Sequence, residues 1–353
     1  MRDAEALSRL DVSVGIESSK SERPEGYRPE PDAAKHPIFQ WPPKPGEIFK
    51  YLFGFPGYLW PYATFFAGVA LLYWLFLTPE LSKMRNASVG WIALLFVGNV
   101  ALLLMFAGFL HLRLYVRKAQ GTKYKYNKKW LSVDNPTFLF RDQVWDNVFW
   151  TVCSAVPVWT AYQAATFWLQ ANGFAPTVTW QSHPVYCVLL LIFTQVWIDL
   201  HFSTTHRLLH WSPLFRWVHS VHHKNINTGP WSGLAMHPLE HVIYFSGVML
   251  FWIVPSHPLH SVYLLVYHVL GDIVGHHGFD RLVLSKRISI NTNHYMHYLH
   301  HKYVRVNYGT GVLNFDRLFG TFHNGSDEST QALMSRNRVR AHRSRKGGEG
   351  VAS

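Results

Sequence analysis

Three short histidine boxes constrain this chain more than any other feature of its sequence. They read HRLLH at 206–210, HSVHH at 219–223 and HYLHH at 297–301. Residues three and four apart share one face of a helix, so each box directs its imidazoles toward one point. Imidazole binds iron, copper, zinc and nickel, and eight converging imidazoles are too many for one ion, so the boxes predict two metal ions. The eight histidines are His206, His210, His219, His222, His223, His297, His300 and His301.

The composition of the 353-residue chain is typical of a membrane protein. Hydrophobic residues make up 48%, aromatic residues 16% and charged residues only 15%. Several apolar runs reach the roughly 20 residues that a helix needs to cross a bilayer. The net charge of +12 could suit nucleic acid, but beside these apolar runs it favours anionic lipid headgroups, so no nucleic-acid partner is expected.

The cysteines and the N-terminus exclude several classes of protein. Cys153 and Cys187 lie in apolar runs and form no C-x-x-C motif, which argues against an iron–sulfur cluster, a zinc ribbon and a disulfide framework. The start, MRDAEALSRLDVSVG, lacks the apolar core of a cleavable signal. We therefore expect membrane insertion through internal spans.

The apolar runs predict four to six transmembrane helices. The first four lie at about 58–78, 88–112, 147–169 and from 184 into the first box. A further apolar hairpin, 239–254 and 258–274, is short for two full spans and is either a tilted or a re-entrant pair. The segment 113–129 carries seven Lys or Arg residues, so the positive-inside rule predicts that it is cytoplasmic. Alternation of the spans then brings all three boxes to the cytoplasmic face.

The residues around the boxes narrow the chemistry. HRLLH lacks the glutamate of the H-E-x-x-H zinc peptidases, and the chain has no E-x-x-H motif of the ferritin-like type. A metal transporter would need ionisable groups at membrane depth, whereas these boxes lie at span ends. A haem-binding electron carrier would leave the HH doublets unexplained. A redox metal at the membrane surface fits better, with these two as the alternatives.

The order of these elements resembles the sterol desaturase / fatty acid hydroxylase superfamily of integral-membrane di-iron oxygenases. The resemblance runs from Asp199 to about Gly320. Besides the boxes it includes AMHPLE (235–240), GHHGFD (275–280), NYG (307–309) and FDRLFGT (315–321). It implies that the eight box histidines and a ninth, His276, hold two non-haem irons, with O2 as co-substrate. Asp272 stands where some hydroxylases have another histidine, so the tenth ligand is left open.

Six further residues could ligate a metal or support a ligand. Asp272 is favoured as support for His276, because ligating histidines donate their second N–H to a partner. Asp199 lies seven residues before His206, on about the same helical face, and could do the same. Other residues suit a helix start or lie a turn away from a ligand. The six are Asp272, His237, His294, His268, Asp199 and Glu240.

The resemblance implies an all-α fold of polytopic membrane helices with a cytosolic helical cap that carries the di-iron site. The chain is expected to divide into four parts. They are a disordered or interfacial segment (1–50), a transmembrane hairpin with a basic cytosolic loop (51–146), a catalytic domain of the fatty acid hydroxylase/sterol desaturase type (147–325) and a basic disordered tail (326–353).

The implied reaction is hydroxylation or desaturation of an unactivated C–H bond in a sterol, a fatty acyl chain or a sphingoid or amino-lipid. Such a bond needs a metal oxidant, because side chains alone do not supply one. The chain has no H-P-G-G or G-x-G-x-x-G motif, so a separate cytochrome b5, ferredoxin or reductase is expected, and the basic loop could dock an acidic donor. The expected location is a bacterial inner membrane or an endomembrane such as the ER.

Overall fold

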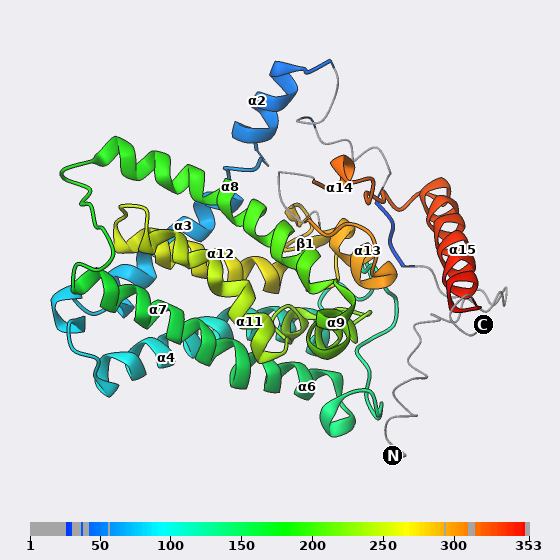
Figure 1. Ribbon diagram of the computed structural model, residues 1–353, viewed down its shortest axis with the longest axis horizontal. Helices are drawn as coiled ribbons and strands as arrows, with labels where there is room; N and C mark the ends of the chain where they lie inside the picture. The colour runs from blue at the N-terminus through cyan, green and yellow to red at the C-terminus, as the bar shows by residue number, and fades with distance from the viewer. Residues whose placement is uncertain are drawn as a thin grey trace.

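The structure is a computed structural model that describes residues 26–29, 37, 42–55, 57–292, 294–309 and 315–349. The described part is mostly helical (Figure 1). Its helices are α2 Pro45–Phe53, α3 Tyr62–Leu77, α4 Val89–Leu103, α5 Phe109–His111, α6 Gln143–Trp150, α7 Val156–Ala171, α8 Pro184–Leu209, α9 Ser212–Leu214, α10 Ser220–His223, α11 Pro238–Phe245, α12 Pro258–Gly275, α13 Tyr295–Tyr303, α14 Phe315–Leu318 and α15 Asp327–Glu349. The strands described are β1 Arg281–Val283 and β2 Ser289–Asn291, paired antiparallel with Leu282 opposite Ile290.

Short stretches of other helix types join these elements. π-helical turns at Leu104–Gly108 and Leu112–Val116 carry α4 and α5 on to Val116 as one helix, and another at Thr151–Ala155 joins α6 to α7. A fourth π-helical turn, Phe215–His219, leads into α10. The 3-10 turns are Leu81–Met84, Leu139–Arg141, Pro230–Ser232 and Ser246–Trp252.

Two helices in the described part are long and apolar enough to cross a membrane, Val89–Val116 and Pro184–Leu209. Helix α3 is apolar but shorter. The run predicted to span at 147–169 is helical, but it buries the polar side chains of Thr160 and Gln163 against other helices. The predicted hairpin at 239–274 forms α11, a 3-10 turn and α12. The count of four to six spans and the cytosolic cap remain predictions.

Helix α12 forms the centre of the fold. It packs against α3, α7 and α8, and in Figure 1 it lies between α8 on one side and α7 and α4 on the other. Leu264, Leu265 and Val269 are fully buried along it. Pro258 begins the helix, where a missing N–H costs nothing, and His276 ends it. The helix therefore runs through the apolar core and delivers a histidine at its end.

Helix α8 carries the first histidine box at its C-terminal end. Its 26 residues extend for about 39 Å at 1.5 Å per residue, which exceeds the roughly 30 Å of a bilayer's hydrocarbon core. Leu189 and Val196 expose apolar side chains along it, as a lipid-facing helix would. A helix of this length, crossing a bilayer from its N-terminal end, would carry His206 and His210 to the edge of the hydrocarbon.

The two ends of the chain were predicted to be disordered or interfacial, and the structure describes part of each. The tail predicted to be disordered instead forms helix α15, Asp327–Glu349. It begins with acidic residues that favour a helix N-terminus, and Ser326 accepts a hydrogen bond from the N–H of Ser329 as a cap. Most of the segment 1–36 lies outside the described residues. Helix α2 buries none of its residues and exposes Phe49 and Phe53, as an interfacial segment would.

A buried polar network joins α3, α4 and α7. The Tyr73 hydroxyl donates to Asn99 Oδ1 at 2.7 Å, and Asn99 Nδ2 lies 3.0 Å from both Thr160 Oγ1 and Gln163 Oε1. Asn99 is completely buried. Polar side chains that pair between apolar helices fix their relative positions, because the alternative is an unsatisfied group in an apolar medium.

Replacing Asn99 with Ala should therefore destabilise the helix assembly. The change leaves the Tyr73, Thr160 and Gln163 side chains without this partner, which costs about 1–3 kcal/mol for a buried group. We expect a lower thermal midpoint in detergent, measured against Asn172→Ala, which removes an asparagine that is exposed at the end of α7. Equal midpoints for the two variants would contradict the role of the network.

Candidate metal centre

Nine histidines converge in two neighbouring clusters. The first, the five-histidine cluster, consists of His206, His210, His219, His223 and His300. The second, the four-histidine cluster, consists of His222, His276, His297 and His301. Within each cluster the possible ligand atoms all lie within 4.8 Å of one another. The structure thus brings together all eight box histidines and His276.

Each HH doublet divides between the two clusters. His222 belongs to the four-histidine cluster and His223 to the other, while His300 and His301 divide in the opposite order. Successive side chains on a helix point about 100° apart, since a turn takes 3.6 residues. One doublet on α10 and one on α13 therefore reach two adjacent positions at once, which explains why the sequence pairs its histidines.

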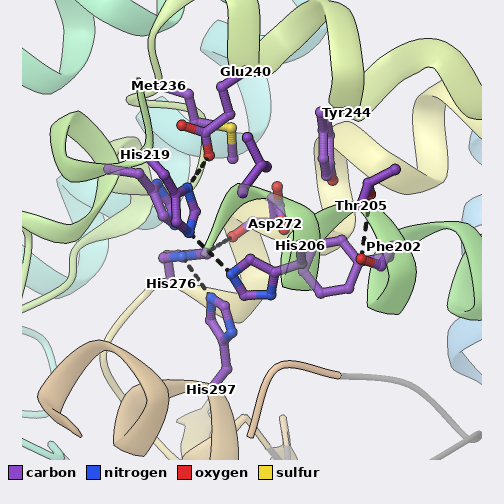
Figure 2. A pocket seen from close by; sticks show the side chains of 12 residues that line it. Phe202, Thr205, His206, His219, Met236, Glu240, Tyr244, Asp272, His276 and His297 are labelled. Atoms are coloured by element: carbon purple, nitrogen blue, oxygen red, sulfur yellow. Dashed lines mark hydrogen bonds and ion pairs between the residues drawn. The ribbon is translucent and has the colours of Figure 1, made fainter. Parts of the chain in front are cut away.

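The ring nitrogens that meet are the Nε2 atoms. In the five-histidine cluster, His206 Nε2 lies 3.2 Å from His219 Nε2, and His300 Nε2 lies 3.1 Å from His210 Nε2. In the four-histidine cluster, His276 Nε2 lies 2.8 Å from His297 Nε2 and 3.0 Å from His301 Nε2. Figure 2 shows His206, His219, His276 and His297 turned toward a common point.

Backbone carbonyls fix the tautomers of three of these rings. His206 Nδ1 lies 2.6 Å from Tyr308 O, His300 Nδ1 lies 2.6 Å from Val306 O, and His276 Nδ1 lies 2.8 Å from Asp272 O. A carbonyl only accepts, so in each neutral ring Nδ1 carries the proton and Nε2 presents a bare lone pair.

The bare lone pairs make these clusters suitable for cations. Nitrogen atoms that meet at about 3 Å without protons between them repel one another, and a cation placed between them converts the repulsion into coordination. His219 Nδ1 lies 2.6 Å from Glu240 Oε1, the carboxylate–histidine arrangement common behind metal ligands. The donor set fits two ions that accept nitrogen ligands.

Burial keeps the imidazoles neutral and able to coordinate. Burial, and then the neighbouring imidazoles, hold the pKa values of these side chains well below 6.5. The residues concerned are His219, His222, His223, His297 and His301. Ligating histidines must be neutral at the nitrogen that binds, so the site is ready for metal at neutral pH.

Acidification should destabilise the metal-free protein. The unfolded histidines take up protons near pH 6.5, whereas the folded clusters resist protonation, so stability is complete above about pH 6.5 and falls below it. For each histidine that the fold keeps neutral, the free energy of unfolding falls by on the order of 1.4 kcal/mol per pH unit below that pH. Thermal unfolding of chelator-treated protein at pH 7.5, 6.5 and 5.5 measures the effect. A midpoint that does not change with pH would contradict it.

The segment 306–309 orients one histidine of the box on α8 and one of the box on α13 through its backbone carbonyls. Its carbonyls at Val306 and Tyr308 accept from His300 and His206. Asp316 anchors it, because Asp316 Oδ2 accepts from the N–H of Gly309 at 2.7 Å and Oδ1 accepts from Arg207 at 2.6 Å. Arg207 also stacks on the Tyr308 ring, 4.6 Å from its centre. The buried Asp316 carboxylate thus connects Arg207, the residue after His206, to the segment whose Tyr308 carbonyl orients the His206 ring.

Replacing Asp316 with Asn should weaken the five-histidine cluster. The amide cannot pair with the Arg207 guanidinium and accept from Gly309 as the carboxylate does, so the Tyr308 carbonyl loses its fixed position. Changes to groups behind a metal ligand typically cost about 10–100-fold in metal affinity. Metal titration of the purified variant measures this loss. Asp327→Asn, which removes an exposed carboxylate beside Arg28, should bind metal as the parent does.

A small cavity lies against both clusters (Figure 2). Phe202, Leu209 and Met236 provide apolar wall, and Thr205 and Tyr244 provide hydroxyl groups. Members of both clusters also line it, together with two acidic residues. These are His206, His219, His222, His276, His297, Glu240 and Asp272. A molecule in this cavity would touch both metal positions.

The six residues predicted as possible metal ligands or supports lie in different parts of the site and its surroundings. Glu240 and Asp272 line the cavity, although neither belongs to a cluster. His237 caps α11 by accepting from the N–H of Leu239, a structural role. The other three are also outside the clusters: Asp199 lies on α8 two turns before the first box, His268 packs against the ring of Tyr244, and His294 lies next to Gly275.

Comparison with known proteins agrees with the position of the site. Residues 187–321 match the family described as fatty acid hydroxylase. The Delta(7)-sterol 5(6)-desaturase of Candida glabrata is 26% identical over 179 residues, which are 49% of this chain and 48% of that protein. The corresponding protein of Gibberella zeae is 30% identical and covers 48% of each chain. The Delta(7)-sterol-C5(6)-desaturase of Nicotiana tabacum is 25% identical over 51% of this chain and 65% of its own.

The chain therefore spans about half the length of the fungal relatives that it matches and 65% of the tobacco protein. No solved structure matches it. The similarity includes the region of all nine converging histidines and reaches Asp316, which anchors the segment 306–309, and Thr321, whose carbonyl accepts from the N–H of Asn307 in that segment.

Proposed function

Through residues 187–321 the chain belongs to the sterol desaturase / fatty acid hydroxylase superfamily, and on that premise we propose that it is a membrane-bound, O2-dependent di-iron enzyme that hydroxylates or desaturates a lipid. The observation that carries the proposal is the convergence of nine imidazoles, eight of them buried, in two clusters beside one cavity. The nine histidines are the proposed iron ligands, five at one position and four at the other.

Two irons would supply the oxidising power that side chains lack. Hydroxylation consumes the substrate, O2, two electrons and two protons, and gives the alcohol and one water. Desaturation consumes the same reagents, removes two hydrogens from adjacent carbons and gives the alkene and two waters. Either reaction needs electrons from a separate protein, for which a cytochrome b5, a ferredoxin or a reductase is proposed.

The side chains and carbonyls around the cavity would bind the substrate and orient the metal ligands. Phe202, Leu209 and Met236 form an apolar wall that suits a hydrocarbon carbon. The carbonyls of Tyr308 and Val306 keep two ligand rings in the tautomer that coordinates. The burial of the clusters excludes bulk water from the reacting carbon.

A sterol is the leading substrate class. The relatives from Candida glabrata, Gibberella zeae and Nicotiana tabacum are named as Delta(7)-sterol desaturases, and the cavity wall is apolar on one side. Fatty acyl, sphingoid and amino-lipid substrates are the other proposed classes. The active site is proposed to face the cytoplasm, in an endomembrane such as the ER or in a bacterial inner membrane.

The basic segment 113–129 is the proposed docking surface for an acidic electron donor. Lys125 is buried, and Arg113 donates to the carbonyl of Val283, so both serve the fold. The five other cations of the segment are exposed and available to an acidic electron donor: Arg117, Lys118, Lys123, Lys128 and Lys129.

Lipid mass spectrometry of cells with and without the protein tests the function. We expect a lipid that gains one oxygen or loses two hydrogens only when the protein is present. Replacing His300 with Ala should abolish this product while the protein stays in the membrane, because His300 is the imidazole that bridges His210 and His223.

The matched control is His183→Ala, which removes an exposed histidine at the opposite end of α8 and should leave the product unchanged. Full product formation by His300→Ala would contradict the ligand assignment. An unchanged lipid profile with fully iron-loaded protein and a competent electron donor would contradict the proposed reaction.

A further inference from the structure

The two histidine clusters are not equivalent. Five imidazoles converge in one and four in the other, so an ion in the four-histidine cluster has one protein nitrogen fewer. Among the described residues no other His, Cys, Asp or Glu lies close enough to join that cluster directly. The missing ligand must therefore be solvent or substrate, or a group that acts through solvent.

Asp272 is in position to act through solvent. It lies on α12 one turn before His276, and residues four apart share a helix face. Its carboxylate lines the same cavity as His222, His276 and His297, three members of the four-histidine cluster. Figure 2 shows Asp272 beside His276 at the cavity wall.

One oxygen of this carboxylate meets no donor at full hydrogen-bond geometry in the described structure. Asp272 Oδ2 is buried, and the neighbouring Tyr244 hydroxyl, which interacts with the carboxylate, donates its hydrogen bond to the carbonyl of His268. A buried unpaired carboxylate oxygen is costly, and in a cavity beside a metal position a water molecule is its natural donor. Glu240, the other carboxylate of the cavity, contacts His219 of the five-histidine cluster through Oε1, and its buried Oε2 likewise has no hydrogen bond among the described residues.

The backbone of Asp272 is held rigidly on two sides. Its carbonyl accepts from His276 Nδ1 at 2.8 Å, and the chain at Gly233 packs directly against it. A Cβ atom at Gly233 would lie 2.5 Å from Asp272 O, closer than real contacts allow, and 3.2 Å from His276 Nδ1. The backbone of Asp272 and the ring of the ligand His276 are therefore held together, which keeps the carboxylate within one helical turn of the cluster.

We propose that Asp272 completes the four-histidine position by holding a water molecule at the coordination place that the five-histidine cluster fills with its fifth imidazole. The four-histidine position is then the one with an exchangeable ligand that faces the cavity. This inference rests on the proposed function only in assuming that both clusters hold metal.

Metal titration of purified full-length variants tests the proposal without turnover. Calorimetry with Zn²⁺ should resolve two sites in the parent protein. Asp272→Leu should weaken one of them about 10–100-fold, the usual effect of removing a supporting group, and leave the other unchanged. Asp272→Asn should lose less affinity, because an amide still hydrogen-bonds water. The control Asp280→Asn removes a carboxylate four residues after His276 that bonds the Tyr126 hydroxyl, and it should change neither site.

The Mössbauer spectrum of ⁵⁷Fe-loaded protein gives a second measurement. The parent should show two unlike iron signals, and Asp272→His, which offers a fifth imidazole to the four-histidine position, should make them more alike. Unchanged affinities and signals in Asp272→Leu would overturn the proposal, as would an equal loss at both sites, which indicates a purely structural role. Protein that binds Zn²⁺ at both sites but forms no lipid product with iron would overturn the proposed function and leave the role of Asp272 intact.

Discussion

The structure depends on holding neutral imidazole nitrogens face to face. Nε2 atoms 2.8–3.2 Å apart repel one another when neither carries a proton, and burial prevents protonation from relieving the repulsion. The fold must therefore supply the free energy that keeps the rings together before a cation arrives. Carbonyls at Tyr308, Val306 and Asp272 supply part of it, since each fixes one ring without adding charge.

Much of this support comes from the half of the chain that carries no histidine box. The Tyr115 hydroxyl lies 2.9 Å from the carbonyls of both Thr228 and His277, next to the second box and next to His276. Gly278 has a φ of +84°, and a Cβ there would come within 2.6 Å of the Tyr115 hydroxyl oxygen. Lys125 Nζ, buried below, donates to the carbonyls of Asn127 and Lys129. The segment 113–129, interpreted from sequence as a topological signal, is also a scaffold for the metal centre.

Sequence patterns anticipated the composition of the site better than its supports. Eight converging imidazoles correctly indicated more than one metal position. Helical spacing predicted that each box would converge on one point, which holds for HRLLH but is wrong for the second and third boxes, whose doublets divide between the two clusters. The division into five and four could not be predicted, since it depends on how α10 and α13 face each other. The hydrogen bond from His206 to the carbonyl of Tyr308 could not be predicted either, because every residue has a carbonyl and only the fold determines which one accepts. Within the tail predicted as disordered, the described residues Asp327–Glu349 form a helix instead. The charge pattern did not predict it, because the start of the helix depends on the Ser326 cap and the acidic first turn.

Helix α8 combines an exposed apolar surface with residues that line the cavity beside the metal positions. The same helix exposes Leu189 and Val196 outward and contributes Phe202, Thr205 and Leu209 to the cavity before and within the first box. Under the proposed function, its length of about 39 Å, against roughly 30 Å of hydrocarbon, would place the reacting carbon at the edge of the bilayer rather than at its centre. A carbon near the polar end of a lipid lies at that depth without leaving the membrane, whereas a carbon far along an acyl tail would have to be drawn toward the headgroups. For the proposed lipid oxidation, the position of the cavity on α8 thus favours a carbon close to the polar end of the substrate, as in a sterol ring.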